Sequence, residues 1–242
     1  MPDRKTILVF HGISMSGQSM LNTLGPLGAQ LTQAGFHLIA PNGPVQMTDQ
    51  QVRATVSWLS KGYTARGQDI HAVFREGGFW SNGEHYEWFD ARRNNETRTW
   101  TYHALLESIA VIRDAVNTEP VIGVLGFSQG CAMAAVAAAL AVRGVLPFGD
   151  TLRFAVLLSG FQPHFQKPEM ELWPVADLPA LIIGGTDDAV FPDPKGLIQL
   201  QAAFPASVMH LVAGLQHTVP DDPEWVARIT RFAVEHSSMG SR

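Results

Sequence analysis

The sequence predicts an α/β fold in which a mostly parallel central sheet is covered by helices on both faces. Short apolar runs typical of strands alternate with longer segments of helical character along the 242 residues. The strand-like runs are almost continuously apolar, as expected for strands that are buried on both faces. With 46% hydrophobic and only 16% charged residues, the chain can bury a sizeable core, and disorder is not expected.

Each element is predicted from its local pattern. The expected strands are six short apolar runs at residues 6–10, 36–40, 121–125, 154–158, 180–183 and 208–211. The expected helices cover residues 16–34, 102–116, 129–142, 194–203 and 223–235. The last two start at a proline, which is tolerated in the first helical turn because its missing N–H would have no partner there. No repeat or linker is visible, so we expect a single domain over residues 1–242.

One segment, residues 41–101, has no clear periodicity. It contains four tryptophans, which argue against disorder: Trp58, Trp80, Trp88 and Trp100. A long segment without clear elements is often functional, so we interpret it as a cap or pocket wall at the carboxyl edge of the sheet. The alternative is an ordinary insertion with one or two short helices packed on the core. In the first case we expect Trp88, Phe89 and Phe161 to line an apolar substrate pocket.

The clearest motif is Gly126-Phe127-Ser128-Gln129-Gly130. It follows an expected strand and opens an expected helix, which is the context of the nucleophile elbow in an α/β-hydrolase fold. Small residues two before and two after the serine let strand and helix approach closely. Ser128 is therefore the candidate nucleophile, and the backbone N–H of Gln129 is a candidate donor to an oxyanion.

A second oxyanion donor is expected in the loop that follows the first strand. This loop begins with His11-Gly12-Ile13, where the glycine permits a tight turn. The backbone N–H of Ile13 is the favoured donor, with Ser14 as the next residue to consider. We expect the ring of His11 to hold the loop in place.

A serine hydroxyl needs a base to take its proton and an acid to orient that base. In this fold the acid and the histidine follow the serine in that order, on loops after later strands. His217 is the candidate base, because it follows the last expected strand. Asp187 is the favoured acid, with Val190 packing beneath it, and the adjacent Asp188 is the alternative.

Composition excludes several other classes of protein. The net charge of −5, without a cluster of Lys or Arg, argues against nucleic acid and anionic membranes as partners. The single cysteine, Cys131, permits no internal disulfide. No segment fits a signal peptide or a membrane span, so a cytoplasmic protein is expected. No metal is expected, because the histidines lack a His-x-x-x-His spacing. The sequence does not fix the oligomeric state.

With these residues in place, the chain resembles the FSH family of serine hydrolases, which is related to the acyl-protein thioesterases and carboxylesterases. The similar features include Phe10-His11-Gly12, Ala40-Pro41, Trp88-Phe89, the serine motif, Leu158-Ser159-Gly160-Phe161, Asp187 with Val190 and Pro192, and His217 with Val219-Pro220. The resemblance implies a doubly wound hydrolase that cleaves esters or thioesters without a cofactor. Some fungal relatives release polyketides from carrier proteins.

The chain departs from the family pattern in two loops. The segment from Asp187 to Pro192 is one residue longer than the usual Asp-x-x-Val-Pro, and Leu215-Gln216 stand where relatives often carry two glycines. Both departures affect the shape of the pocket.

Arg92 and Arg93 follow Trp88-Phe89 in the sequence. They could meet an anionic leaving group such as a phosphopantetheine arm, or they could be exposed loop charges.

Together these residues predict a serine hydrolase that cleaves small-molecule esters or thioesters of apolar, medium-chain acyl groups through an acyl-enzyme. An acyltransferase or an acyl-releasing thioesterase would use the same residues, so both stay open. So does a receptor that has kept the fold and binds ligand without hydrolysing it.

Overall fold

The computed structural model describes residues 5–65, 84–94, 96–97, 99–116, 120–164 and 171–237. Its centre is a six-stranded sheet of order β10-β9-β8-β7-β1-β2, in which all neighbouring strands are parallel. The strands are β1 (Lys5–Phe10), β2 (Phe36–Ile39), β7 (Val121–Phe127), β8 (Phe154–Leu158), β9 (Ala180–Gly185) and β10 (Ser207–Val212). All six expected strands are present, and the predicted α/β fold with its parallel sheet is confirmed.

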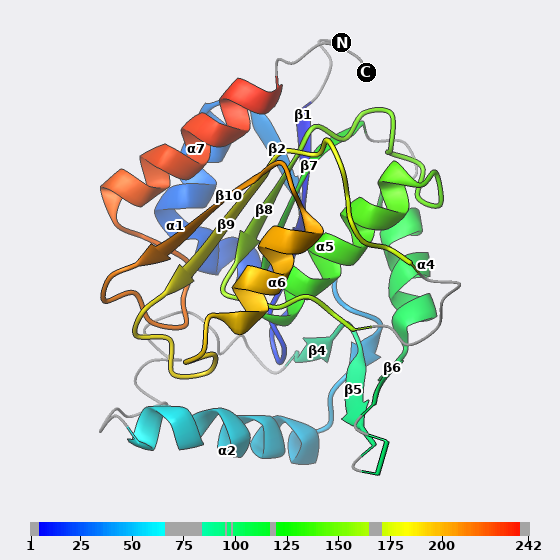
Figure 1. Ribbon diagram of the computed structural model, residues 1–242, viewed down its shortest axis with the longest axis vertical. Helices are drawn as coiled ribbons and strands as arrows, with labels where there is room; N and C mark the ends of the chain where they lie inside the picture. The colour runs from blue at the N-terminus through cyan, green and yellow to red at the C-terminus, as the bar shows by residue number, and fades with distance from the viewer. Residues whose placement is uncertain are drawn as a thin grey trace.

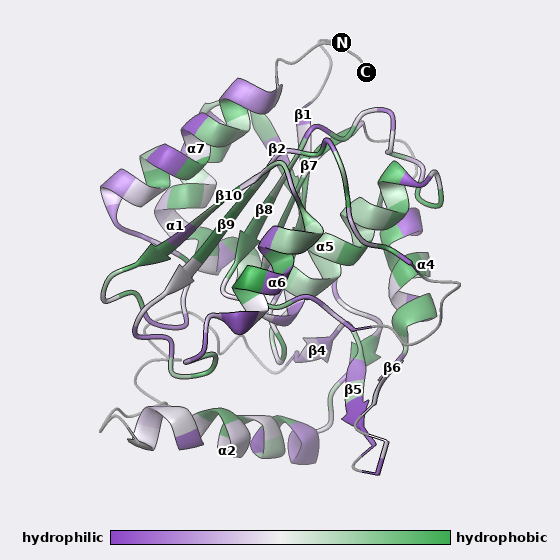
Figure 2. Cartoon of the chain, in the orientation of Figure 1, coloured by the Kyte–Doolittle hydropathy of each residue, from purple (hydrophilic) through white to green (hydrophobic). Residues whose placement is uncertain are grey.

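Helices cover both faces of this sheet (Figure 1). On one face α1 (Gly17–Gln33) and α7 (Pro223–Ser237) pack against each other and the strands. On the other face lie α5 (Gln129–Val142) and α6 (Lys195–Ala203), and α4 (Leu105–Ala115) shares their apolar core. The alanine-rich α5 is buried along nearly its whole length, and Figure 2 shows it and the central strands in hydrophobic colours. Its small side chains allow close contact with β7, which brings the serine motif to a fixed place.

The boundaries of two helices follow from local chemistry. Ser16 caps α1, because its side chain accepts a hydrogen bond from the N–H of Ser19 and that serine bonds back. Within α1 the backbone is kinked at Gly25, which has a φ of 44°. The prediction of a helix from Tyr102 was wrong at its start, because Tyr102 pairs with Ala91 in a hairpin. Ala104, with a left-handed φ of 64°, then turns the chain into α4.

The described parts of residues 41–103 form one long helix and four short strand pieces. These are β3 (Val45–Gln46), α2 (Asp49–Ala65), β4 (Tyr86–Glu87) and β5 (Asp90–Arg93), and β5 pairs with β6 (Trp100–His103). Figure 1 shows α2 lying across the molecule beyond the carboxyl ends of the sheet strands. One side of α2 contributes Leu59 and Tyr63 to the core. Within the described ranges, no helix combines the length and apolarity that crossing a membrane requires.

Candidate active site

Ser128 occupies a sharp turn between β7 and α5. Its φ of 56° and ψ of −120° are unusual for a residue with a side chain, and its backbone N–H donates to the carbonyl of Leu158 at 3.0 Å. Such strained conformations persist only where surrounding structure enforces them, and they concentrate at functional sites. The turn directs the Ser128 hydroxyl to the carboxyl edge of the sheet, as the motif predicts.

The two glycines of the motif are required by close backbone contacts. A Cβ atom on Gly126 would lie 2.1 Å from the carbonyl oxygen of Gly130, and one on Gly130 would lie 2.2 Å from the carbonyl oxygen of Phe10. Any larger residue would therefore separate the strand from the helix. This agrees with the sequence-based explanation of the motif.

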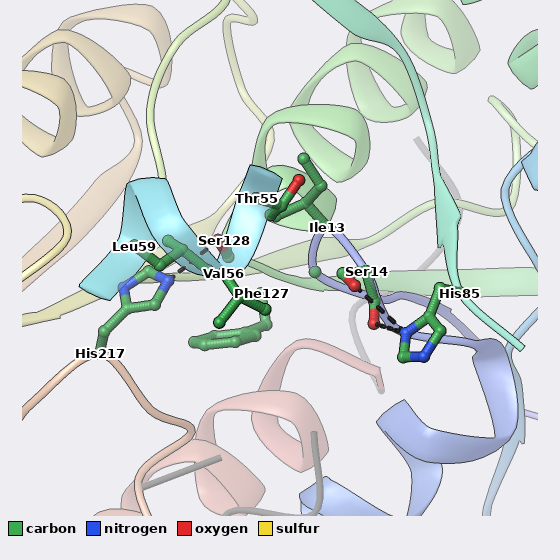
Figure 3. A pocket seen from close by; sticks show the side chains of 10 residues that line it. Ile13, Ser14, Thr55, Val56, Leu59, His85, Phe127, Ser128 and His217 are labelled. Atoms are coloured by element: carbon green, nitrogen blue, oxygen red, sulfur yellow. Dashed lines mark hydrogen bonds between the residues drawn. The ribbon is translucent and has the colours of Figure 1, made fainter. Parts of the chain in front are cut away.

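A chain of hydrogen bonds joins the serine to a histidine and an aspartate. Nε2 of His217 lies 3.0 Å from Oγ of Ser128, and Nδ1 of His217 lies 2.8 Å from Oδ2 of Asp188. Figure 3 shows the ring of His217 directed at Ser128. All three residues are buried, although the chain brings them from three separate loops. The predicted pairing of Ser128 with His217 is thus present.

The residue that orients His217 is Asp188, so the choice of Asp187 was wrong. Asp187 is exposed, and its carboxylate accepts a hydrogen bond from the hydroxyl of Thr186. Its backbone N–H is held by the carbonyl of Leu215. Of the two adjacent carboxylates, the structure brings that of Asp188 to the imidazole. Val190, expected beneath the acid, is partly buried against the core and lines the large cavity.

Asp188 is held by a second set of bonds. Its Oδ1 accepts hydrogen bonds from the backbone N–H groups of Val190 and Phe191, both at 2.8 Å. Burial alone would raise the pKa of this carboxyl group, but the hydrogen bond and charge of His217 and the two N–H groups outweigh it, so its pKa is lowered. Asp188 is therefore an anion placed to fix one tautomer of His217.

The two expected oxyanion donors lie at the same cavity as Ser128. Both Ile13 and Gln129 line it together with the serine. Among the described residues no partner is found for the backbone N–H of either one, whereas the N–H of Ser14 donates to Tyr86. This geometry favours Ile13 over Ser14, as the sequence suggested.

The side chain of Gln129 has a role that the sequence analysis missed. Its Oε1 accepts a hydrogen bond from the backbone N–H of Trp88, and its Nε2 donates to the carbonyl of Phe89. These bonds fix the segment after β4 to the start of α5. In the sequence, only the presence of a glutamine in the serine motif could have suggested that its side chain holds the segment after β4.

Trp88 is a core residue, and its prediction as a pocket residue was wrong. It is fully buried, its ring packs on Phe10 and His11, and its Nε1–H donates to the carbonyl of His11 at 2.9 Å. The ring of His11 in turn bonds Gly12 and accepts from the N–H of Gly43. Burial lowers the pKa of His11 to about 4, so the ring is neutral. His11 and Trp88 together hold the loop that carries Ile13.

Two cavities meet at Ser128. The larger has a volume of about 750 Å³, and Phe89 and Phe161 line it as predicted. Trp58 and Trp100 also line it, while Trp80 lies outside the described residues. The smaller, of about 30 Å³, is formed by Ser128, His217 and residues of α2 and the β1 loop (Figure 3). Such volumes suit a small-molecule ligand and a few waters, respectively.

Comparisons with known proteins show the family of this chain. The model of the serine hydrolase (FSH1) family matches residues 1–229. Esterase OVCA2 of Danio rerio is 28% identical over 217 residues, covering 88% of this chain and 89% of its own. Family of serine hydrolases 3 of Saccharomyces cerevisiae is 24% identical over 238 residues, covering 96% of this chain and 84% of its own.

A solved structure shows the same fold. Acyl-protein thioesterase 2 of Zea mays superposes with a TM-score of 0.60 and 19% identity, covering 98% of this chain and 95% of that one. At this identity the likeness shows the α/β-hydrolase fold alone.

Proposed function

Because the chain belongs to the FSH1 family of serine hydrolases, we propose that it cleaves carboxylic esters or thioesters of apolar acyl groups through an acyl-enzyme on Ser128. The observation that carries this proposal is the hydrogen-bonded series Ser128, His217 and Asp188 at a strained turn. A serine so placed has both a base within reach and a fixed acid behind the base.

In the acylation step, His217 accepts the proton of Ser128 while the oxygen attacks the substrate carbonyl carbon. Asp188 holds the proton-bearing Nδ1 and stabilises the imidazolium that forms. The N–H groups of Ile13 and Gln129 donate to the negative oxygen of the tetrahedral intermediate, and the N-terminus of α5 adds its partial positive charge. His217 then protonates the leaving alcohol or thiol.

The small cavity supports hydrolysis as the second half of the reaction. It contacts both Ser128 and His217, and its volume of about 30 Å³ exceeds the roughly 10–15 Å³ that one water requires. A water there would lie beside the base that must activate it. Transfer of the acyl group to another acceptor would need that acceptor to enter the same place.

The large cavity supports an apolar acyl group of medium length. Its walls include Trp58, Phe89 and Trp100, and burial of each methylene against such walls contributes about 0.8 kcal/mol. We expect kcat/KM to rise from acetyl to about hexanoyl or octanoyl, with a gain of up to about fourfold per methylene.

The test is a series of 4-nitrophenyl esters from acetyl to decanoyl, run beside acyl thioesters of the same lengths. Burst kinetics and release of free acid would support hydrolysis through an acyl-enzyme. No turnover of any ester or thioester by the folded protein would overturn the proposal. Product analysis with added alcohols distinguishes hydrolysis from acyl transfer.

A further inference from the structure

The large cavity contains a carboxyl group that the proposed reaction does not use. Glu87 lies in the short strand β4, where it pairs with Val45 of β3. Its neighbour Trp88 donates its backbone N–H to the side chain of Gln129, the residue directly after Ser128. The backbone of Glu87 is therefore tied to the serine turn, and Glu87 lines the same cavity as Ser128.

Glu87 is a largely buried residue whose carboxyl oxygens make no hydrogen bond to the described residues. Only 7% of the residue is exposed. These oxygens are not among the fully enclosed polar atoms without a partner, so they are accessible from the cavity that Glu87 lines. A group of this kind that opens into a binding cavity points to a partner supplied by the ligand.

The charges around the cavity favour one kind of ligand group. Asp90 is a second carboxylate in its lining, and none of the described lining residues is Lys or Arg. Arg92 pairs with Asp90 at 2.6 Å, but it is exposed on the hairpin and is not part of the lining. Arg92 is therefore not placed to receive an anionic leaving group inside this cavity.

We propose that Glu87 determines substrate specificity by accepting a hydrogen bond from a hydroxyl or ammonium group that the substrate carries into the large cavity. The negative charge of Glu87 would also repel, and so exclude, substrates that carry a carboxylate or phosphate at that position. This inference rests on the proposed function, since it assigns the substrate class of the same site.

The ionisation of Glu87 decides the pH of the test. Burial, together with the nearby charge of Asp90, raises the pKa of Glu87 to about 7, against the opposing charge of Arg92. The other titratable groups that line the cavity are Tyr102 and His164. The assays are therefore run at pH 8.5, where Glu87 of the wild type carries its charge.

The experiment uses 4-nitrophenyl esters of four-, six- and eight-carbon acyl chains that end in methyl, hydroxyl, ammonium or carboxylate. The same end groups are also placed on the alcohol part of acetate esters, so that either part of the substrate can enter the cavity. Wild type is compared with Glu87→Gln, and Glu107→Gln is the control. Glu107 is an exposed glutamate of α4 outside the cavity, so this variant makes the same change of charge elsewhere.

In at least one series, wild type should prefer the hydroxyl or ammonium ester to the carboxylate ester by about tenfold or more, as expected for a charge-assisted hydrogen bond. Glu87→Gln should remove most of this preference, while Glu107→Gln should keep it. Unchanged ratios in Glu87→Gln, with unsubstituted esters still hydrolysed, would overturn the inference alone.

A second measurement separates this failure from failure of the proposed function. If wild type hydrolyses no ester, binding of the corresponding 4-nitroanilide analogues is followed by calorimetry. Tighter binding of donor-bearing analogues to wild type than to Glu87→Gln would support the role of Glu87 without turnover. Equal affinities for both proteins would overturn it.

Discussion

Nδ1 of His217 lies 2.8 Å from Oδ2 of Asp188, and the two side chains are 4% and 2% exposed. The second carboxylate oxygen of Asp188 is held by two backbone N–H groups, so the carboxylate cannot rotate away from the imidazole. This arrangement fixes which ring nitrogen carries the proton and leaves Nε2 facing Ser128. It also makes the two adjacent aspartates chemically different.

Asp188→Asn should lower kcat by roughly 10³–10⁴, because an amide in place of the carboxylate favours the wrong tautomer of His217. Asp187→Asn should change kcat by less than about threefold, since that exposed side chain bonds Thr186 instead. Steady-state kinetics on one ester measure both. The opposite ranking would show that Asp187 orients the base in solution.

The spacing of this loop favours Asp188 over Asp187 as the acid. Counted from Asp187, the loop is one residue longer before Pro192 than the usual Asp-x-x-Val-Pro. Counted from Asp188, the spacing is regular, with Phe191 in place of valine. The sequence alone does not show which side chain turns inward, because that depends on the bonds that Asp188 makes to the following N–H groups.

Trp88→Ala should lower stability by about 3–5 kcal/mol and affect all substrates alike, because it leaves a cavity in the core and removes the hydrogen bond to His11. Trp58→Ala should instead flatten the dependence of kcat/KM on acyl-chain length, since Trp58 is 54% exposed and lines the large cavity. Thermal melts and the ester series, measured on both variants, separate the two effects. A flattened slope with an unchanged melting temperature in Trp88→Ala would contradict this assignment.

Glu87→Gln should stabilise the protein at high pH. The folded-state pKa of Glu87 is about 7, above its ordinary value of 4.5, so the folded state holds the proton more tightly. The wild type therefore loses stability as pH rises from about 4.5 to 7, by an amount on the order of 1–3 kcal/mol. Urea unfolding at pH 4.5 and 8.5 should show the variant gaining stability only at the higher pH. An equal difference at both values would mean that Glu87 does not titrate in this range.

The fold could be predicted because each sheet strand is a short, mostly apolar run, which the local pattern reveals. The structure of residues 41–101, between β2 and α4, could not be predicted, because it depends on contacts with residues far away in the sequence. Tyr102 looked like the start of a helix until its pairing with Ala91 placed it in a hairpin. Trp88 looked like a pocket wall because composition does not distinguish a core tryptophan from a lining one. Glu87 had no sequence signal, because its proposed role depends on its position in the lining of the large cavity.

The proposed reaction requires no metal. Among the residues that the structure describes, no group of three or more His, Cys, Asp or Glu side chains could hold a metal ion. Because the proposed mechanism moves protons only between Ser128, His217 and the substrate, hydrolysis should continue unchanged after dialysis against a chelator. Loss of activity that returns when a divalent ion is added would contradict the serine mechanism.

The central claim is that Ser128 is the nucleophile, and covalent labelling tests it most directly. Wild type should react with a fluorophosphonate, and mass spectrometry of its peptides should place the phosphonyl group on Ser128. Ser128→Ala should fold normally, remain unlabelled and retain less than a few percent of the hydrolytic activity, because the base and the oxyanion donors cannot replace the missing hydroxyl. A label on another residue, or a variant that hydrolyses esters at the wild-type rate, would contradict the account.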